Sequence, residues 1–228
     1  MRQFRIALPL FYAIYTGIVN AASLPSGFVY LHDVVPAITL DIRYANTNNF
    51  VGTPIDGYVR SVAITTSETA KALNNAQADL QRFGLSLKVF DAYRPQRSVD
   101  HFVRWAKDFH DLRMQAEYYP HIAKQNLFRE GYIASKSGHS RGSTVDVTLI
   151  YADANGLAQE LDMGTHFDFF DTRSWPEYRG LTAAQRANRM LLQVVMEKHG
   201  FKPYPKEWWH FTLKQESYPD TYFNFDVE

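Results

Sequence analysis

Two side chains that can bind a metal ion lie seven residues apart near the middle of the sequence. His139 and Asp146 fall within the segment SKSGHSRGSTVDVTLI (135–150), where a turn leads into a run of β-branched residues. Such a run is typical of a β-strand, and Gly138 and Gly142 can adopt the backbone angles of a tight turn. A neutral imidazole and a carboxylate are two of the three protein ligands of a catalytic zinc site. Alone, the pair is equally compatible with a buried histidine and a strand aspartate that make ordinary hydrogen bonds.

The segment EWWH (207–210) supplies a third ligand and a base. His210 would complete a His-His-Asp site whose fourth position is open to water, and Glu207 would take the proton of that water. Because residues three apart on a strand point to opposite faces, we expect Glu207 on the turn before the strand. Arg94 lies at a strand-to-helix corner, where it would face the oxyanion that forms on an attacked carbonyl. Each residue has a structural alternative, as a surface acid, a core histidine or a surface salt bridge, but together they favour a metal site.

The elements around these residues indicate a single α+β domain, because strands and helices do not alternate as in βαβ units. The patterns predict strands at 27–30, 39–44, 85–90, 145–150 and about 208–213, a loop at 151–178, and helices at 65–83, 95–106, 121–129 and 182–198. Capping boxes are expected at Thr65–Glu68 and Thr182–Gln185. Buried helix faces are expected at Ala70, Leu73, Ala76, Gln77, Leu80 and Phe83, and at Ala183, Ala187, Met190, Leu191 and Val194.

Composition excludes several classes of protein. The chain has 228 residues, 46% of them hydrophobic, with 24 basic and 24 acidic side chains. Because these charges balance, the sequence has no excess of basic residues with which to bind nucleic acid or an anionic membrane. There is no cysteine, so no disulfide framework is available.

The first residues have the layout of a secretory signal peptide. Two arginines precede an uncharged segment at 6–19, and the small residues Ala21 and Ala22 follow. Cleavage after Ala21 would leave a mature domain of residues 22–228. The apolar segment is shorter than the ~20 residues that span a bilayer, so we expect export to the periplasm without a stable membrane anchor.

Three blocks of the sequence resemble the VanX-type D-alanyl-D-alanine dipeptidases: DAYRP (91–95), SKSGHSRGSTVD (135–146) and EWWH (207–210). Further similarity appears in DIRYA (41–45), NFVG (49–52), MGTHFDFFD (163–171) and YPDTYF (218–223). The resemblance implies a zinc metallopeptidase with the fold shared by Hedgehog-like and D-Ala-D-Ala-cleaving proteins, built on a central, mostly antiparallel sheet with flanking helices.

The same resemblance implies roles for individual residues. One Zn²⁺ per chain would be bound by His139, Asp146 and His210, with Glu207 as general base and Arg94 as transition-state stabiliser. At the substrate end, Ser137 and Asp168 would contact the dipeptide, Asp168 near its free amine, while Tyr44 and Asp91 would line or brace the pocket. The chain departs from the family pattern at Gly138, where the best-known member has a serine.

The implied activity is hydrolysis of D-Ala-D-Ala to two D-alanines outside the cytoplasm, in cell-wall peptide turnover or scavenging. One alternative is a D,D-carboxypeptidase or endopeptidase that acts on peptidoglycan stems. Another is a zinc-bearing binding module without turnover. Such a module commonly lacks the base or the oxyanion partner, whereas Glu207 and Arg94 are both present.

Overall fold

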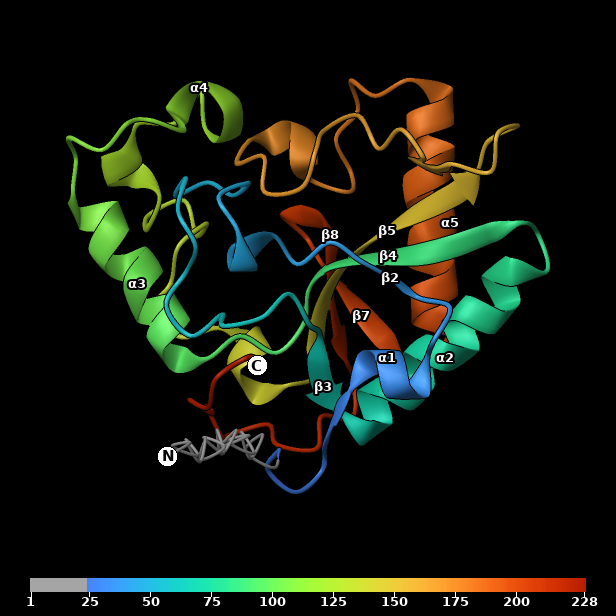
Figure 1. Cartoon of the computed structure of the whole chain (residues 1–228). Helices are drawn as coiled ribbons and strands as arrows, with labels where there is room; N and C mark the ends of the chain where they lie inside the picture. The colour runs from blue at the N-terminus through green and yellow to red at the C-terminus, as the bar shows by residue number, and fades with distance from the viewer. Residues whose placement is uncertain (1–23) are drawn as a thin grey trace, which may run out of the picture.

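A mixed six-stranded sheet runs through the centre of the molecule (Figure 1). The computed structural model describes residues 24–228, so the predicted signal peptide lies outside the described residues. The strand order is β2-β4-β5-β8-β7, with β6 also beside β5; β2 and β4 are parallel and the other pairs are antiparallel. The strands are β2 (Thr39–Leu40), β4 (Leu85–Asp91), β5 (Thr144–Ala152), β6 (Ala158–Glu160), β7 (Phe201–Tyr204) and β8 (Glu207–Leu213). A separate pair is formed by β1 (Phe28–Tyr30) and β3 (Ile64–Thr66).

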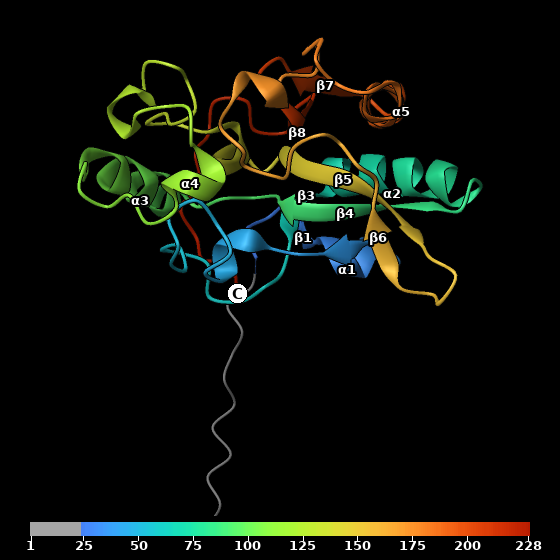
Figure 2. The ribbon, with the colours of Figure 1, turned by 90° about the horizontal axis from the view of Figure 1, so that it is seen from above.

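The helices fall into two groups at opposite sides of the molecule (Figures 1 and 2). On one side α2 packs against β4 and α5, and α5 packs against β5, β7 and β8. On the other side lie α3 and α4. The α-helices are α1 (Leu31–Val34), α2 (Ser67–Gln81), α3 (Gln96–Lys107), α4 (Gln115–Tyr118) and α5 (Ala183–Lys198), and the 3₁₀ turns are η1 (Arg43–Ala45), η2 (Lys124–Asn126), η3 (Gly138–Arg141) and η4 (Thr172–Ser174). The predicted α+β class with a mostly antiparallel sheet is confirmed. No helix among residues 24–228 is long and apolar enough to cross a membrane.

The register of three central strands sets a row of polar residues across the sheet. Asp146 of β5 lies opposite Asp91 of β4 on one side and opposite His210 of β8 on the other. An irregularity in β4 between Val89 and Asp91 shifts the pairing by one residue. Since a bulge changes which face a side chain points to, this shift places Asp91 on the same face as Asp146.

The predicted buried face of α5 is wrong. Met190 is 64% exposed and Val194 55% exposed, whereas the buried residues are Arg189, Leu192 and Met196. The cause is Arg189, whose guanidinium donates three hydrogen bonds inward, to the backbone carbonyls of Met163, Arg173 and Trp175. Because buried carbonyl groups need partners, these bonds turn the polar residue inward and the apolar side chains outward. The predicted capping box at Thr182–Gln185 is confirmed.

Other predicted boundaries also need correction. The cap of α2 is Thr66 and not Thr65. The Thr66 hydroxyl accepts a hydrogen bond from the Thr69 amide, whereas the Thr65 hydroxyl donates to the carbonyl of Gly142. The helix ends at Gln81, and Phe83 beyond it is 79% exposed.

Three predicted segments also differ from the structure. The helix expected at 121–129 is reduced to the single turn η2, where the Lys124 ammonium bonds to the carbonyl of Asp111. The strand expected at 39–44 is shortened to β2 by the turn η1, and the expected loop at 151–178 contains β6 and η4.

Candidate metal centre

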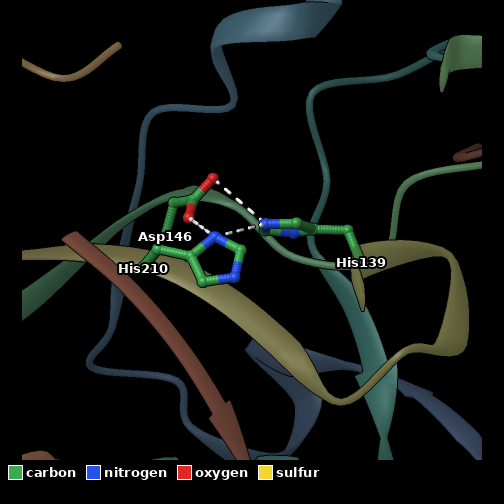
Figure 3. Close-up of side chains that lie close together, drawn as sticks. All are labelled: His139, Asp146 and His210. Atoms are coloured by element: carbon green, nitrogen blue, oxygen red, sulfur yellow. Dashed lines mark hydrogen bonds and ion pairs between the residues drawn. The ribbon is translucent and has the colours of Figure 1, made fainter. Parts of the chain in front are cut away.

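His139, Asp146 and His210 point toward one another from three elements (Figure 3). His139 lies on η3, Asp146 on β5 and His210 on β8. The His139 Nε2 atom is 3.3 Å from Asp146 Oδ2 and 3.3 Å from His210 Nδ1. His210 Nδ1 is 3.1 Å from Asp146 Oδ1. The three residues that the sequence singles out as metal ligands are therefore brought together.

This ligand set fits a zinc ion. Zinc bonds of about 2.0–2.1 Å place neighbouring ligands of a tetrahedron about 3.3 Å apart, close to the separations observed here. The buried Oδ1 of Asp146 has no hydrogen-bond partner, although His210 Nδ1 lies near it. Because a buried carboxylate oxygen normally needs a partner, a cation between the three side chains explains this atom.

The backbone fixes which nitrogen of His139 faces the site. His139 Nδ1 lies 2.7 Å from the carbonyl oxygen of Ala92, which can only accept a hydrogen bond. The Nδ1 atom therefore carries the hydrogen, and the lone pair of Nε2 is free to bind a metal. His210 presents Nδ1 to the same point.

Arg94 is held rigidly beside the three ligands. Its Nε donates to Asp91 Oδ2 at 2.9 Å, and its terminal nitrogen lies 2.8 Å from the same oxygen and 3.6 Å from Asp146 Oδ2. The guanidinium also stacks over the rings of Tyr44 and Phe102. These contacts orient the cation and leave one side of it toward the cavity, which Arg94 lines.

Asp91 braces Arg94 from behind the cavity. Burial raises its pKa, an effect that the Arg94 charge opposes. Its other oxygen accepts a hydrogen bond of 2.5 Å from the Tyr58 hydroxyl. Sequence reasoning did not single out Tyr58, which lies in a loop without a local chemical pattern and meets Asp91 only through the tertiary fold.

Glu207 lies beside His210 with its carboxylate free. Glu207 Oε2 is 3.5 Å from His210 Nδ1, and the side chain makes no hydrogen bond to any described residue. Burial, reinforced by the negative charge of Asp146, raises the pKa of Glu207 to about 7. The predicted position on the turn is corrected, because Glu207 is the first residue of β8. Tyr204 pairs with Glu207 and Pro203 with Phe211, so the residues of β8 between these two positions form a bulge in the β7–β8 pairing, and the simple alternation of faces does not apply.

Tyr44, Asp168 and Ser137, which the sequence predicted at the substrate end, line the same cavity as Glu207. Asp168 is 5% exposed, and its Oδ2 accepts a hydrogen bond of 2.8 Å from the Tyr44 hydroxyl. Burial raises the pKa of Asp168 well above its usual value, with a further contribution from Asp146. Its backbone has a φ of 61°, a strained conformation that is characteristic of functional positions. Ser137 lines the cavity and its hydroxyl accepts a hydrogen bond from the His139 amide.

One cavity of about 230 Å³ connects these residues. It is smaller than the ~300–1,000 Å³ of pockets for drug-sized molecules, so it suits a small ligand. Sequence reasoning missed Lys136, which lines the mouth and makes no ion pair with a described carboxylate. Its position directly before Ser137, within the block SKSGHSRGSTVD (135–146), was a signal that could have identified it.

Comparison with known proteins assigns the chain to a family. A family model described as D-ala-D-ala dipeptidase matches residues 25–228. The chain belongs to the D-Ala-D-Ala dipeptidase family. The resemblance predicted from the sequence blocks and the predicted enzyme class, a metallopeptidase, are thereby confirmed.

Curated members of the D-Ala-D-Ala dipeptidase family match almost the whole chain. A D-alanyl-D-alanine dipeptidase of Enterococcus faecalis is 43% identical over 204 residues, 90% of this chain and 100% of that protein. A D-alanyl-D-alanine dipeptidase of Streptomyces coelicolor is 42% identical over 88% of this chain and 98% of its own length. Among solved structures, a vancomycin-resistance D,D-pentapeptidase, VanY, in complex with Zn(II) covers 71% of this chain and 78% of its own, with 13% identity and a TM-score of 0.40.

Proposed function

We propose that this protein hydrolyses D-Ala-D-Ala to two D-alanines, with one Zn²⁺ held by His139, Asp146 and His210. The observation that carries the proposal is the small cavity that the three ligands, the free Glu207 and the buried Asp168 line together. The curated relatives named as D-alanyl-D-alanine dipeptidases, at 39–43% identity, support the same substrate. When bound, zinc supplies a Lewis acid that polarises the peptide carbonyl and lowers the pKa of water.

Glu207 acts as the general base. Its carboxylate has no competing hydrogen bond, and its pKa of about 7 suits proton transfer near neutral pH. It takes a proton from the water that attacks the peptide carbonyl. It then delivers this proton to the nitrogen of the leaving D-alanine as the C–N bond breaks.

Arg94 stabilises the oxyanion that forms on the attacked carbonyl. Its guanidinium is fixed by Asp91 and by two aromatic rings, so it does not have to reorganise during the reaction. A preorganised donor of this kind typically contributes about 3–4 kcal/mol to the stabilisation of a transition state.

Asp168 selects a free amino terminus. Its buried carboxylate accepts one hydrogen bond, from Tyr44, and faces no ion-pair partner within the described residues. The ammonium group of a dipeptide supplies that partner through a charge-assisted hydrogen bond. A longer peptide presents an uncharged amide at this point and would leave the carboxylate without a cation.

Lys136 binds the carboxylate at the other end of the dipeptide. Its Nζ lies 4.7 Å from the centre of the Tyr222 ring, at the mouth of the cavity. The other cation of the cavity, Arg94, is already neutralised by Asp91 and Asp146. Lys136 is therefore the cation of the cavity wall that remains available for an anionic terminus.

The reaction takes place outside the cytoplasm, in the periplasm. Support for this location comes from the basic, apolar and small-residue order of residues 1–22. An exported dipeptidase meets D-Ala-D-Ala released during cell-wall turnover, which fits a role in recycling or scavenging.

The direct test is hydrolysis of free D-Ala-D-Ala by the mature protein. Release of D-alanine should stop after treatment with a chelator and return when zinc is added. A stem pentapeptide ending in D-Ala-D-Ala separates the dipeptidase from a D,D-carboxypeptidase, because preference for the pentapeptide contradicts the proposal. Glu207→Gln should retain bound zinc and lose turnover; if the unaltered protein binds zinc and hydrolyses neither substrate, it is a binding module.

A further inference from the structure

The outward face of α5 carries apolar side chains that nothing in the described part of the chain covers. Met190, Leu191 and Val194 are exposed, as are Ala183 and Ala187. Their spacing places all five on one face of the helix. Figures 1 and 2 both show α5 at an edge of the molecule, on the side away from α3. Monomeric proteins rarely expose a contiguous apolar face of this kind, and such faces mark interaction sites.

An apolar groove extends this surface beyond the helix. It has a volume of about 380 Å³ and is bordered by Gln193 of α5. Trp175 on its wall is 37% exposed and is tied to α5 through a 2.8 Å hydrogen bond from Arg189 to its carbonyl. The other wall is formed by Pro203 and Pro205 at the β7–β8 hairpin. The groove adjoins α5 at the edge that carries Gln193, and its exposed tryptophan ring adds aromatic area beside the helix face, as is common at interfaces.

We propose that this face is the contact between two copies of the chain, paired with antiparallel α5 helices about a two-fold axis between Met190 and Leu191. The face is self-complementary, as a two-fold interface requires. About that axis, Met190 of one copy lies against Leu191 of the other. Ala187 lies against Val194 in the same way, so a small side chain meets a larger one on each side of the axis.

Charges on one flank of α5 favour this antiparallel arrangement. Arg186, Gln193 and Glu197 lie along one edge of the helix, because separations of seven and eleven residues are nearly whole numbers of turns. In an antiparallel two-fold pair this edge meets the same edge of the second copy. Arg186 of each copy then lies beside Glu197 of the other, which forms two ion pairs.

A parallel pair does not offer the same complementarity. It would set the charged edge against the opposite flank, which carries Ala184, Asn188 and Val195. An anionic membrane is also a poorer fit, because helices that lie on such membranes carry lysine and arginine on their polar flanks. Here the flank has one positive and one negative charge. The second copy is the occupant that matches both the apolar face and its edge.

The first experiment measures the mass of the mature protein by sedimentation velocity over a concentration series. The unaltered chain should sediment as a dimer. Leu191→Glu places one glutamate from each copy beside an apolar partner near the axis of the pair, so two like charges are desolvated and repel each other, and the substitution should halve the mass. Phe83→Glu, a change at an exposed residue outside the face, is the matched control and should remain a dimer. Hydrolysis by Leu191→Glu should match the unaltered protein, since Leu191 does not line the catalytic cavity.

The second experiment determines the orientation of the helices by cross-linking. The chain has no cysteine, so one introduced thiol per copy reports a single contact. Met190→Cys lies near the axis and should form an intermolecular disulfide with the thiol oxidant diamide. In the antiparallel pair, the two Ala183→Cys thiols are about 22 Å apart along the helix axis and cannot meet.

The results of the two experiments distinguish an antiparallel pair of chains from a monomer, from a membrane-bound chain and from a parallel pair. A dimer that Leu191→Glu dissociates and that cross-links through residue 190 and not through residue 183 supports the proposal. A chain that stays monomeric throughout the series overturns it, whether or not the protein sediments with phosphatidylglycerol vesicles. Cross-linking through residue 183 also overturns it, because that result indicates parallel helices.

Discussion

At the scale of single residues, the cavity carries more negative charge than its own cations balance. Asp146, Asp168 and Glu207 line it together with Arg94 and Lys136, and Arg94 is already bound to Asp91 behind the wall. Burial raises the pKa values of Asp168 and Glu207, because no cation of the chain compensates their charges fully. The proposed divalent metal and the ammonium group of the proposed substrate would supply the missing positive charge.

Asp168→Asn should reduce kcat/KM for D-Ala-D-Ala by about tenfold to a hundredfold, because a hydrogen bond to a charged group contributes about 1.5–3 kcal/mol. The substitution keeps the shape of the side chain and removes the charge that faces the ammonium. The control variant Tyr44→Phe keeps the carboxylate and removes only the hydroxyl that donates to it, so it should have a smaller effect. Steady-state kinetics test the pair; an equal loss with N-acetyl-D-Ala-D-Ala, which has no ammonium, would contradict the role of Asp168.

Lys136→Gln should raise KM for D-Ala-D-Ala about fivefold and leave kcat unchanged, since an exposed charge pair contributes at most about 1 kcal/mol. The lysine is exposed at the cavity mouth and touches no ligand of the metal. The C-terminal amide of the dipeptide serves as the control substrate, because it has no carboxylate. If the substitution raises KM for the amide to the same extent, Lys136 does not bind the carboxylate.

At the scale of elements, the sequence predicted best where local patterns and tertiary packing agree. The strands that carry Asp146 and His210, and the capping box of α5, follow from residue type and spacing alone. The face of α5 could not be predicted in this way, because Arg189 turns inward to reach carbonyl groups of a distant loop. The helix expected at 121–129 does not form for a similar reason, because Lys124 makes a tertiary hydrogen bond to the carbonyl of Asp111.

The candidate site shows the same division. The types and the order of its residues could be predicted from the sequence, because the motifs at 135–146 and 207–210 are continuous segments. The position of Glu207 within β8 was not, since the bulge opposite Pro203 depends on how the hairpin pairs. The contribution of Tyr58 was also hidden, because it reaches Asp91 from 33 residues away in the sequence.

Gly142→Ala should destabilise the protein and lower its activity by displacing the turn that carries His139. Gly142 ends η3 with a φ of +79°, and an added Cβ would lie 2.3 Å from the Phe28 ring. The matched control is Gly156→Ala, where φ is +78° but nothing lies within 4 Å of the added Cβ. Both variants carry the backbone penalty of about 1–2 kcal/mol, so the difference between their unfolding free energies in urea isolates the clash. Equal free energies would show that Phe28 moves aside without strain.

At the scale of the whole molecule, the β7–β8 hairpin connects the two surfaces for which a function is proposed. Tyr204 lines the catalytic cavity and also the groove beside α5. Its ring lies 5.3 Å from that of His210, and Glu207 begins the second strand of the same hairpin. Because the hairpin packs on α5 through β7, a second copy bound at α5 would lie against the element that carries the proposed base and one proposed metal ligand.

The stability of the metal-free protein should fall as pH rises, and the stabilisation by zinc should grow. Burial raises the folded pKa of Glu207 from 4.5 to about 7, so its neutral form favours the fold at low pH and this contribution is lost as pH rises to about 7. The pKa of His210 is also raised: burial lowers it, but Asp146 outweighs that effect, so the contribution of His210 is lost in the same direction. Zinc binds the neutral imidazole and offsets the ionised carboxylates.

Thermal unfolding of chelator-treated and zinc-loaded protein from about pH 5 to about pH 8 measures this linkage, with the gap in Tm expected to widen as pH rises. Glu207→Gln is the control, because an amide does not titrate. In that variant the metal-free protein should lose less stability between the two pH values. A gap in Tm that narrows toward high pH would show that deprotonated groups of this cavity do not bind the metal.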